Sequence, residues 1–155
     1  MIRKVFSYFL LLFLCTSSVW PQFFGFGRNK VQYTNFDWHV LKTEHFDIYY
    51  YPEMEELAKY GGFLAEQSYI ELSRKFVHVI NDRIPLIFYS SHLHFQQTNT
   101  TPGIIPEGVG GFFEFFKGRV VIPYTGSIHK VHHVIKHELV HVFMYSKMNR
   151  ILAEH

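Results

Sequence analysis

His137-Glu138-Leu139-Val140-His141 is the most informative stretch of this 155-residue chain. The two histidines are four residues apart, so a helix places them on one face, where both imidazoles can bind one metal ion. Glu138 follows the first histidine and lies about a third of a turn around the helix. Its carboxylate can therefore act as a general base beside that ion. We expect His137 and His141 to be metal ligands and Glu138 to be the catalytic residue.

The surrounding sequence predicts a helix. Residues 128–148 contain neither Gly nor Pro, and apolar residues recur at helical spacing. Ser127 or Thr125, just after Pro123 and next to Gly126, is the expected N-cap. On a helical wheel, apolar residues lie on both faces: Val131, Ile135, Leu139 and Val142 on the side far from the histidines, and Val134, Met144 and Met148 beside them.

A helix that is apolar nearly all round is expected to be buried. Buried histidines and a buried glutamate need polar partners, because unpaired polar groups in an apolar interior are costly. A metal ion would satisfy all three side chains. The alternative is a core helix whose histidines form hydrogen bonds with neighbouring backbone.

Residues 1–20 are predicted to be a signal peptide. Arg3 and Lys4 form a basic start, residues 5–15 are apolar, and residues 16–18 are small, as at a cleavage site. We expect cleavage between Ser17 and Gln22. The apolar run is too short to span a bilayer, and an amphipathic or buried N-terminal helix is the alternative.

Composition bounds the function. Cys15 is the only cysteine, so the mature chain is expected to have neither a disulfide nor a thiol nucleophile. Without Arg3 and Lys4, the 15 basic residues become 13, equal to the 13 acidic ones. A neutral chain gives no reason to expect nucleic acid or a membrane surface as a partner. The mature residues, about 135, are enough for one domain with a core.

Hydrophobic patterns predict an α+β domain over residues 36–155, preceded by an extended lead-in at 21–35. The sheet is expected to be mixed or mostly antiparallel. Gly61-Gly62 is expected to interrupt or bend the first long helix. The predicted elements are strands Trp38–Leu41 and Phe46–Tyr51, a helix Glu53–Val79, a strand Ile84–Tyr89, a loop Ser90–Gly111, and a hairpin Phe112–Phe116 with Arg119–Ile122.

The predicted loop carries two further histidines, His92 and His94. They are read either as extra metal ligands or, preferably, as surface histidines. Asn99-Thr100-Thr101 fits a glycosylation sequon, which matters only in a eukaryotic secretory route.

The order of elements, ending in residues 134–143, resembles the N-terminal part of gluzincin-type zinc metallopeptidases. The resemblance is closest to the peptidase MA-like domains of exported bacterial proteins. Residues 44–50 and 110–114 are similar to stretches of those domains, and the resemblance spans roughly residues 36–148. Only the H-E-x-x-H motif is specific.

The resemblance implies a zincin-like N-terminal subdomain with a long helix, and an endopeptidase that hydrolyses peptides or proteins. His137 and His141 would bind zinc, and Glu138 would take a proton from the attacking water and pass it to the leaving amine. Residues 119–122, just before the motif helix, would offer backbone groups to an extended peptide; an ordinary edge or core strand is the alternative. Such domains often precede a β-propeller. With the signal, the resemblance predicts export: periplasmic, outer-membrane-associated or extracellular in a Gram-negative bacterium.

The sequence departs from this family at the third metal ligand. In gluzincins it is a glutamate on a following helix, about twenty or more residues past the second histidine, whereas only fourteen residues follow His141. Glu154 and His133 are the available substitutes, and neither fits the usual arrangement. Tyr145 could face the site or pack in the core. We therefore expect a domain truncated at its C-terminus, with the third ligand downstream of His155.

Three functions follow from these observations. The first is an exported zinc-dependent peptidase domain that is inactive as this fragment. The second is a degenerate peptidase fold that binds peptides or a partner domain without catalysis. The third is a metal-binding protein with two histidine ligands and no peptidase ancestry.

Overall fold

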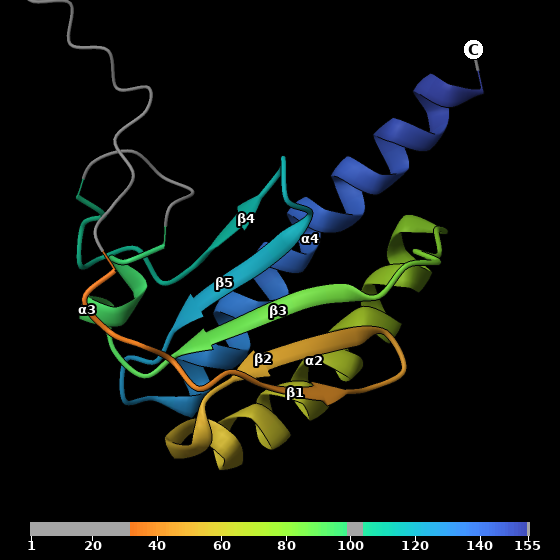
Figure 1. Ribbon diagram of the computed structural model, residues 1–155. Helices are drawn as coiled ribbons and strands as arrows, with labels where there is room; N and C mark the ends of the chain where they lie inside the picture. The colour runs from red at the N-terminus through yellow and green to blue at the C-terminus, as the bar shows by residue number, and fades with distance from the viewer. Residues whose placement is uncertain (1–31, 99–103, 155) are drawn as a thin grey trace, which may run out of the picture.

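The computed structural model describes residues 32–98 and 104–154 (Figure 1). The predicted signal peptide, residues 21–31 of the lead-in and the sequon at 99–101 lie outside the described residues. Within the described part of the chain, no helix is long and apolar enough to cross a membrane.

One mixed sheet forms the centre of the domain, in the order β1-β2-β3-β5-β4. The inner pairs β2/β3 and β3/β5 are parallel, and the outer pairs β1/β2 and β4/β5 are antiparallel. The prediction of an α+β domain with a mixed sheet is confirmed. The strands are β1 (His39–Lys42), β2 (Phe46–Tyr50), β3 (Ile84–Tyr89), β4 (Phe112–Glu114) and β5 (Arg119–Pro123).

Two long helices, α2 (Glu55–Phe76) and α4 (Ile128–Ala153), pack against each other and cover the same face of the sheet (Figure 1). A 3₁₀ turn, η1 (Pro52–Met54), leads into α2, so the predicted helix starts two residues before α2 and ends three residues after it. The predicted loop at 90–111 contains one short helix, α3 (His92–Phe95), which Ser91 caps by accepting a hydrogen bond from the His94 amide.

The core lies between the sheet and these helices. Side chains alternate between the two faces of a strand, and on each of the three inner strands two fully buried residues face the helices. These residues are Phe46, Ile48, Leu86, Phe88, Val120 and Ile122. The alternate set, with Tyr49, Ile87 and Arg119, lines the opposite face of the sheet.

Gly61 and Gly62 do not interrupt α2, so the predicted interruption is wrong. The helix runs through both, and their missing side chains let it approach the sheet. A Cβ on Gly61 would lie 2.5 Å from Cζ of Phe88, and one on Gly62 would lie 2.7 Å from Cδ1 of Ile48. The glycine pair is therefore a packing requirement between α2 and the sheet.

The motif helix is buried along one face only, which corrects the prediction of a buried HExxH helix. Val131, Ile135 and Leu139 are at most 2% exposed, whereas Met144 and Met148 are 55% and 51% exposed. The helix also extends five residues beyond the predicted end at Met148. Of its second apolar stripe, Met144 and Met148 face solvent within the described part of the chain, whereas Val134 is half-buried.

Candidate metal centre

The two motif histidines occupy adjacent turns of α4. Ser127 starts the helix by accepting a hydrogen bond from the Lys130 amide, so Ser127 rather than Thr125 is the cap. His137 is exposed and His141 is half-buried. Both therefore stand on the side of α4 that turns away from the core.

The imidazoles are close enough to share one ion. Their Nε2 atoms lie 3.4 Å apart, and the ring centroids are separated by 5.0 Å. Two nitrogens bound tetrahedrally to zinc at about 2.0–2.1 Å are themselves about 3.3–3.4 Å apart. The spacing of the two Nε2 atoms therefore fits two ligands of one tetrahedral ion. It is long for a hydrogen bond between the rings.

Glu138 lies between the histidines and the core and is 7% exposed. Its carboxylate accepts a hydrogen bond from the backbone N–H of Phe113 on β4. Burial raises the pKa of the Glu138 carboxyl, while nearby His137 and His141 and the Phe113 N–H act in the opposite direction. The two motif histidines and the edge strand β4 thus both lie close to the Glu138 carboxylate.

Two glycines bring β4 against the motif helix. A Cβ on Gly110 would lie 2.9 Å from Cγ2 of Val134, and one on Gly111 would lie 2.8 Å from its Cγ1. Val134 is one helical turn before Glu138, so this close approach sets the backbone of Phe113 beside the motif. Further along, the Tyr145 ring packs on Phe113 with a centroid distance of 5.7 Å. Tyr145 is thus a packing residue.

The free edge of the sheet next to the motif belongs to β4. The prediction that residues 119–122 offer backbone groups to a peptide is wrong, because β5 is hydrogen-bonded to β3 on one side and to β4 on the other. The alternative reading of a core strand holds for β5. Among the described residues, β4 has one strand neighbour, and it follows Gly110-Gly111.

The expected substitutes for a third ligand do not complete the site. Glu154 caps α4 at its far end and pairs with Arg150 at 3.7 Å; thirteen residues of helix place it roughly 20 Å along the axis from His141. His133 lies one turn before His137, with 6.5 Å between ring centroids. Among the described residues, no group of three or more His, Cys, Asp or Glu side chains could hold a metal ion.

His92 and His94 belong to a separate hydrogen-bonded cluster around α3. Nε2 of His92 lies 2.9 Å from the Ile105 carbonyl oxygen. Nδ1 of His94 lies 2.8 Å from the Tyr51 hydroxyl and 3.1 Å from the Ser90 hydroxyl. Both side chains are half-buried, so they hold the segment after β3 and are neither ligands of the motif site nor free surface histidines.

Sequence reasoning missed the Phe113 backbone amide, which is the partner of Glu138. A backbone group has no side-chain signature, but Gly110-Gly111 just before an aromatic run was a usable signal of close backbone approach.

Comparisons with known proteins found no matching family model, curated protein or solved structure.

Proposed function

We propose that this chain is a zinc-dependent metallopeptidase domain of the zincin-like, gluzincin type. The observation that carries the proposal is the 3.4 Å separation of the His137 and His141 Nε2 atoms. The proposal is further supported by the buried Glu138 carboxylate next to the two histidines and by the edge strand β4, which contacts this carboxylate. The two histidines fit zinc by residue type and by spacing.

Each side chain has a defined role in this proposal. His137 and His141 bind the ion as neutral imidazoles through Nε2, and zinc, when bound, supplies Lewis-acid chemistry for hydrolysis of a peptide bond. Glu138 accepts a proton from the attacking water and donates it to the leaving amine. The free edge of β4 pairs with an extended peptide or protein substrate by main-chain hydrogen bonds.

A third ligand from outside the described residues completes the zinc site in this proposal. Two ligands hold zinc more weakly than three or four. We therefore propose that the described residues alone are inactive as a peptidase. The predicted export signal remains a proposal of the same kind, because residues 1–20 lie outside the described part of the chain.

Zinc binding by the purified chain tests the ligand assignment. Equilibrium dialysis followed by elemental analysis should show at most one weakly held zinc per chain, lost in His137→Ala and in His141→Ala. His132→Ala removes another histidine of the same helix and should bind zinc like the parent chain. Equal zinc binding by His137→Ala and the parent would contradict the assignment.

Peptide hydrolysis tests the role of Glu138 once the third ligand is present. A form of the chain that supplies a third zinc ligand should cleave a casein substrate, and Glu138→Gln should abolish cleavage without loss of zinc. Unchanged cleavage by the Glu138→Gln variant would refute the catalytic role. Cleavage by the 155-residue chain itself, dependent on Glu138, would refute the proposed inactivity.

A non-catalytic peptidase-like module is the second candidate. It is favoured by the lack of a three-ligand group among the described residues. In that case the β4 edge binds a peptide or a partner domain, and the extended chain shows no hydrolysis that depends on Glu138. A third possibility, a metal-binding protein with two ligands and no peptidase relation, predicts no downstream helix with a suitable glutamate.

A further inference from the structure

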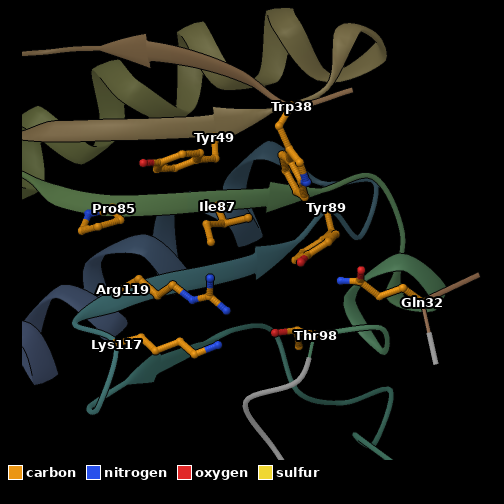
Figure 2. Close-up of a pocket in the computed structure, with 9 residues that line it drawn as sticks. All are labelled: Gln32, Trp38, Tyr49, Pro85, Ile87, Tyr89, Thr98, Lys117 and Arg119. Carbon is orange, nitrogen blue, oxygen red and sulfur yellow. The ribbon is translucent and has the colours of Figure 1, made fainter. Parts of the chain in front are cut away.

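The face of the sheet turned away from α2 and α4 is hollowed into an open cleft of about 550 Å³ (Figure 2). Pro85 and Ile87 of β3 form its floor at the middle of the sheet. Small-molecule sites commonly have volumes of about 300–1,000 Å³. The cleft lies on the face opposite α4, so it is separate from the candidate metal centre.

Aromatic rings form one wall of the cleft. Trp38, just before β1, Tyr49 of β2 and Tyr89 of β3 all project from this face of the sheet (Figure 2). The Trp38 ring stands nearly perpendicular to that of Tyr89, with 5.6 Å between centroids, and it is 38% exposed. A tryptophan that is held in place yet open to solvent offers an apolar contact surface at low entropic cost.

Two basic residues form the opposite wall, Arg119 of β5 and Lys117 in the turn before it (Figure 2). Arg119 is hydrogen-bonded to the buried carboxylate of Glu114. Glu114 therefore balances the guanidinium charge. Lys117 is exposed, and no carboxylate in residues 32–98 or 104–154 lies within ion-pair distance of it. The cleft consequently has one cation in excess.

We propose that this cleft binds a small amphipathic carboxylate. Its apolar group packs against Trp38 and Tyr49, and its carboxylate pairs with Lys117. Neighbouring strands are about 4.8 Å apart, so the distance from Tyr49 on β2 to the β5 side is about 10 Å. The ligand must therefore separate its apolar group from its carboxylate by several bonds.

Titration with 4-phenylbutyrate tests this proposal, with the uncharged 4-phenylbutanamide as the matched compound. The full chain with Trp20→Phe leaves Trp38 as the single tryptophan, so its fluorescence reports on the cleft. We expect saturable binding of the acid with a dissociation constant on the order of a millimolar, as suits a molecule of this size. The amide should bind at least threefold more weakly.

Lysine variants separate a specific site from general apolar binding. Lys117→Ala should weaken binding of the acid about threefold, within the range of an exposed ion pair, and Lys117→Glu, which adds repulsion, about tenfold. Neither change should alter binding of the amide. Lys130→Ala, on the far side of the sheet, is the matched control and should bind both like the parent. Absence of saturable binding, equal binding of acid and amide, or no effect of Lys117→Ala would each overturn the proposal.

Discussion

The phenyl ring of Phe88 fills the space in which a side chain on Gly61 would stand. The closest ring atom is 2.5 Å from the ideal Cβ position, and Phe88 itself is fully buried. The ring cannot move without displacing the core of the sheet, because protein interiors are close-packed. The contact therefore fixes how near α2 lies to β3.

Gly61→Ala should destabilise the domain. Alanine is the better helix former by about 1 kcal/mol, but overpacking of a core usually costs about 1–3 kcal/mol. Because the added Cβ would lie only 2.5 Å from the Phe88 ring, the cost should fall in the upper part of that range. We expect a net loss of about 1–2 kcal/mol in the free energy of unfolding, measured by urea denaturation. Gly108→Ala is the control, because its added Cβ meets no atom within 4 Å. A Gly61→Ala variant as stable as the parent would contradict the packing argument.

Val77→Gly should stabilise the domain. Val77 follows α2 with φ of 48°, the left-handed region, and its side chain is 81% exposed. That conformation costs a β-branched residue about 1–2 kcal/mol, whereas glycine adopts it freely. We expect a gain of about 1 kcal/mol in the free energy of unfolding. The same change at exposed Val79, which lacks a positive φ, should give no gain; a gain there of equal size would refute the conformational explanation.

Acid should destabilise the domain through Glu66. Burial raises the pKa of this carboxyl, but hydrogen bonds from Thr43 and from the amide and ring of His45 outweigh burial, and the net pKa is lowered. The His45 amide and ring nitrogens lie 2.9 and 2.7 Å from the Glu66 oxygens. The folded pKa is below the unfolded value of about 4.5. The stabilisation is therefore complete above that pH and is lost as the pH falls through the folded pKa.

The urea midpoint at pH 6 and at pH 3 measures this effect. Glu66→Gln should be less stable than the parent at pH 6 and should lose less stability between the two values. Glu56→Gln, which alters a carboxylate with 91% side-chain exposure, should keep the parental difference. If Glu66→Gln also keeps the parental difference in stability between pH 6 and pH 3, Glu66 is not the source of the acid sensitivity.

Mild acid should destabilise the domain through protonation of the His78 ring. Its ring is 5% exposed, and Nε2 lies 2.9 Å from the Ser146 hydroxyl. Nδ1 is buried and has no hydrogen-bond partner among the residues that the structure describes. Burial lowers the His78 pKa, and the charges of Arg150 and Lys147 lower it further. The neutral form is thus preferred in the folded state. Neutral His78 therefore contributes its full stability to the folded state above the unfolded pKa of about 6.5, and this stability is lost as the pH falls toward the folded pKa.

His78→Leu should therefore lose less stability than the parent between pH 7.5 and pH 5.5, as measured by urea denaturation at both values. His132→Leu, which changes a half-buried histidine on α4, should retain the parental difference. A parental pH dependence in His78→Leu would show that protonation of the ring is not coupled to folding.

The sheet was predictable where local pattern determines structure. Ile84–Tyr89 was predicted with its observed bounds, because a short apolar run between polar residues has few alternatives to a buried strand. β4 is shorter than the predicted Phe112–Phe116, because Phe115 and Phe116 leave the sheet in the turn and are 54% and 106% exposed. Hydrophobicity alone does not distinguish a strand residue from an exposed turn residue.

The helix that carries the candidate site was predictable from sequence, whereas the surroundings of that site were not. The spacing of His137 and His141 fixes their shared helix face, which the structure reproduces. The burial of that face depends on which element covers it, and the apolar character of Met144 and Met148 gave the wrong answer for the described residues. The contact of Glu138 with Phe113 joins positions far apart in sequence through a backbone group, so no residue pattern encodes it.

The two parallel pairings of the sheet also govern how the domain folds. Phe46 pairs with Ile84, and Leu86 pairs with Val120, so each pairing closes a chain segment of more than thirty residues. Closing such segments costs entropy before the contacts form, and domains built on non-local pairings fold slowly. The β4–β5 hairpin, whose Phe113 contacts Glu138, joins the rest of the sheet through the second of these pairings. We therefore expect the proposed zinc affinity to appear at the same rate as native structure.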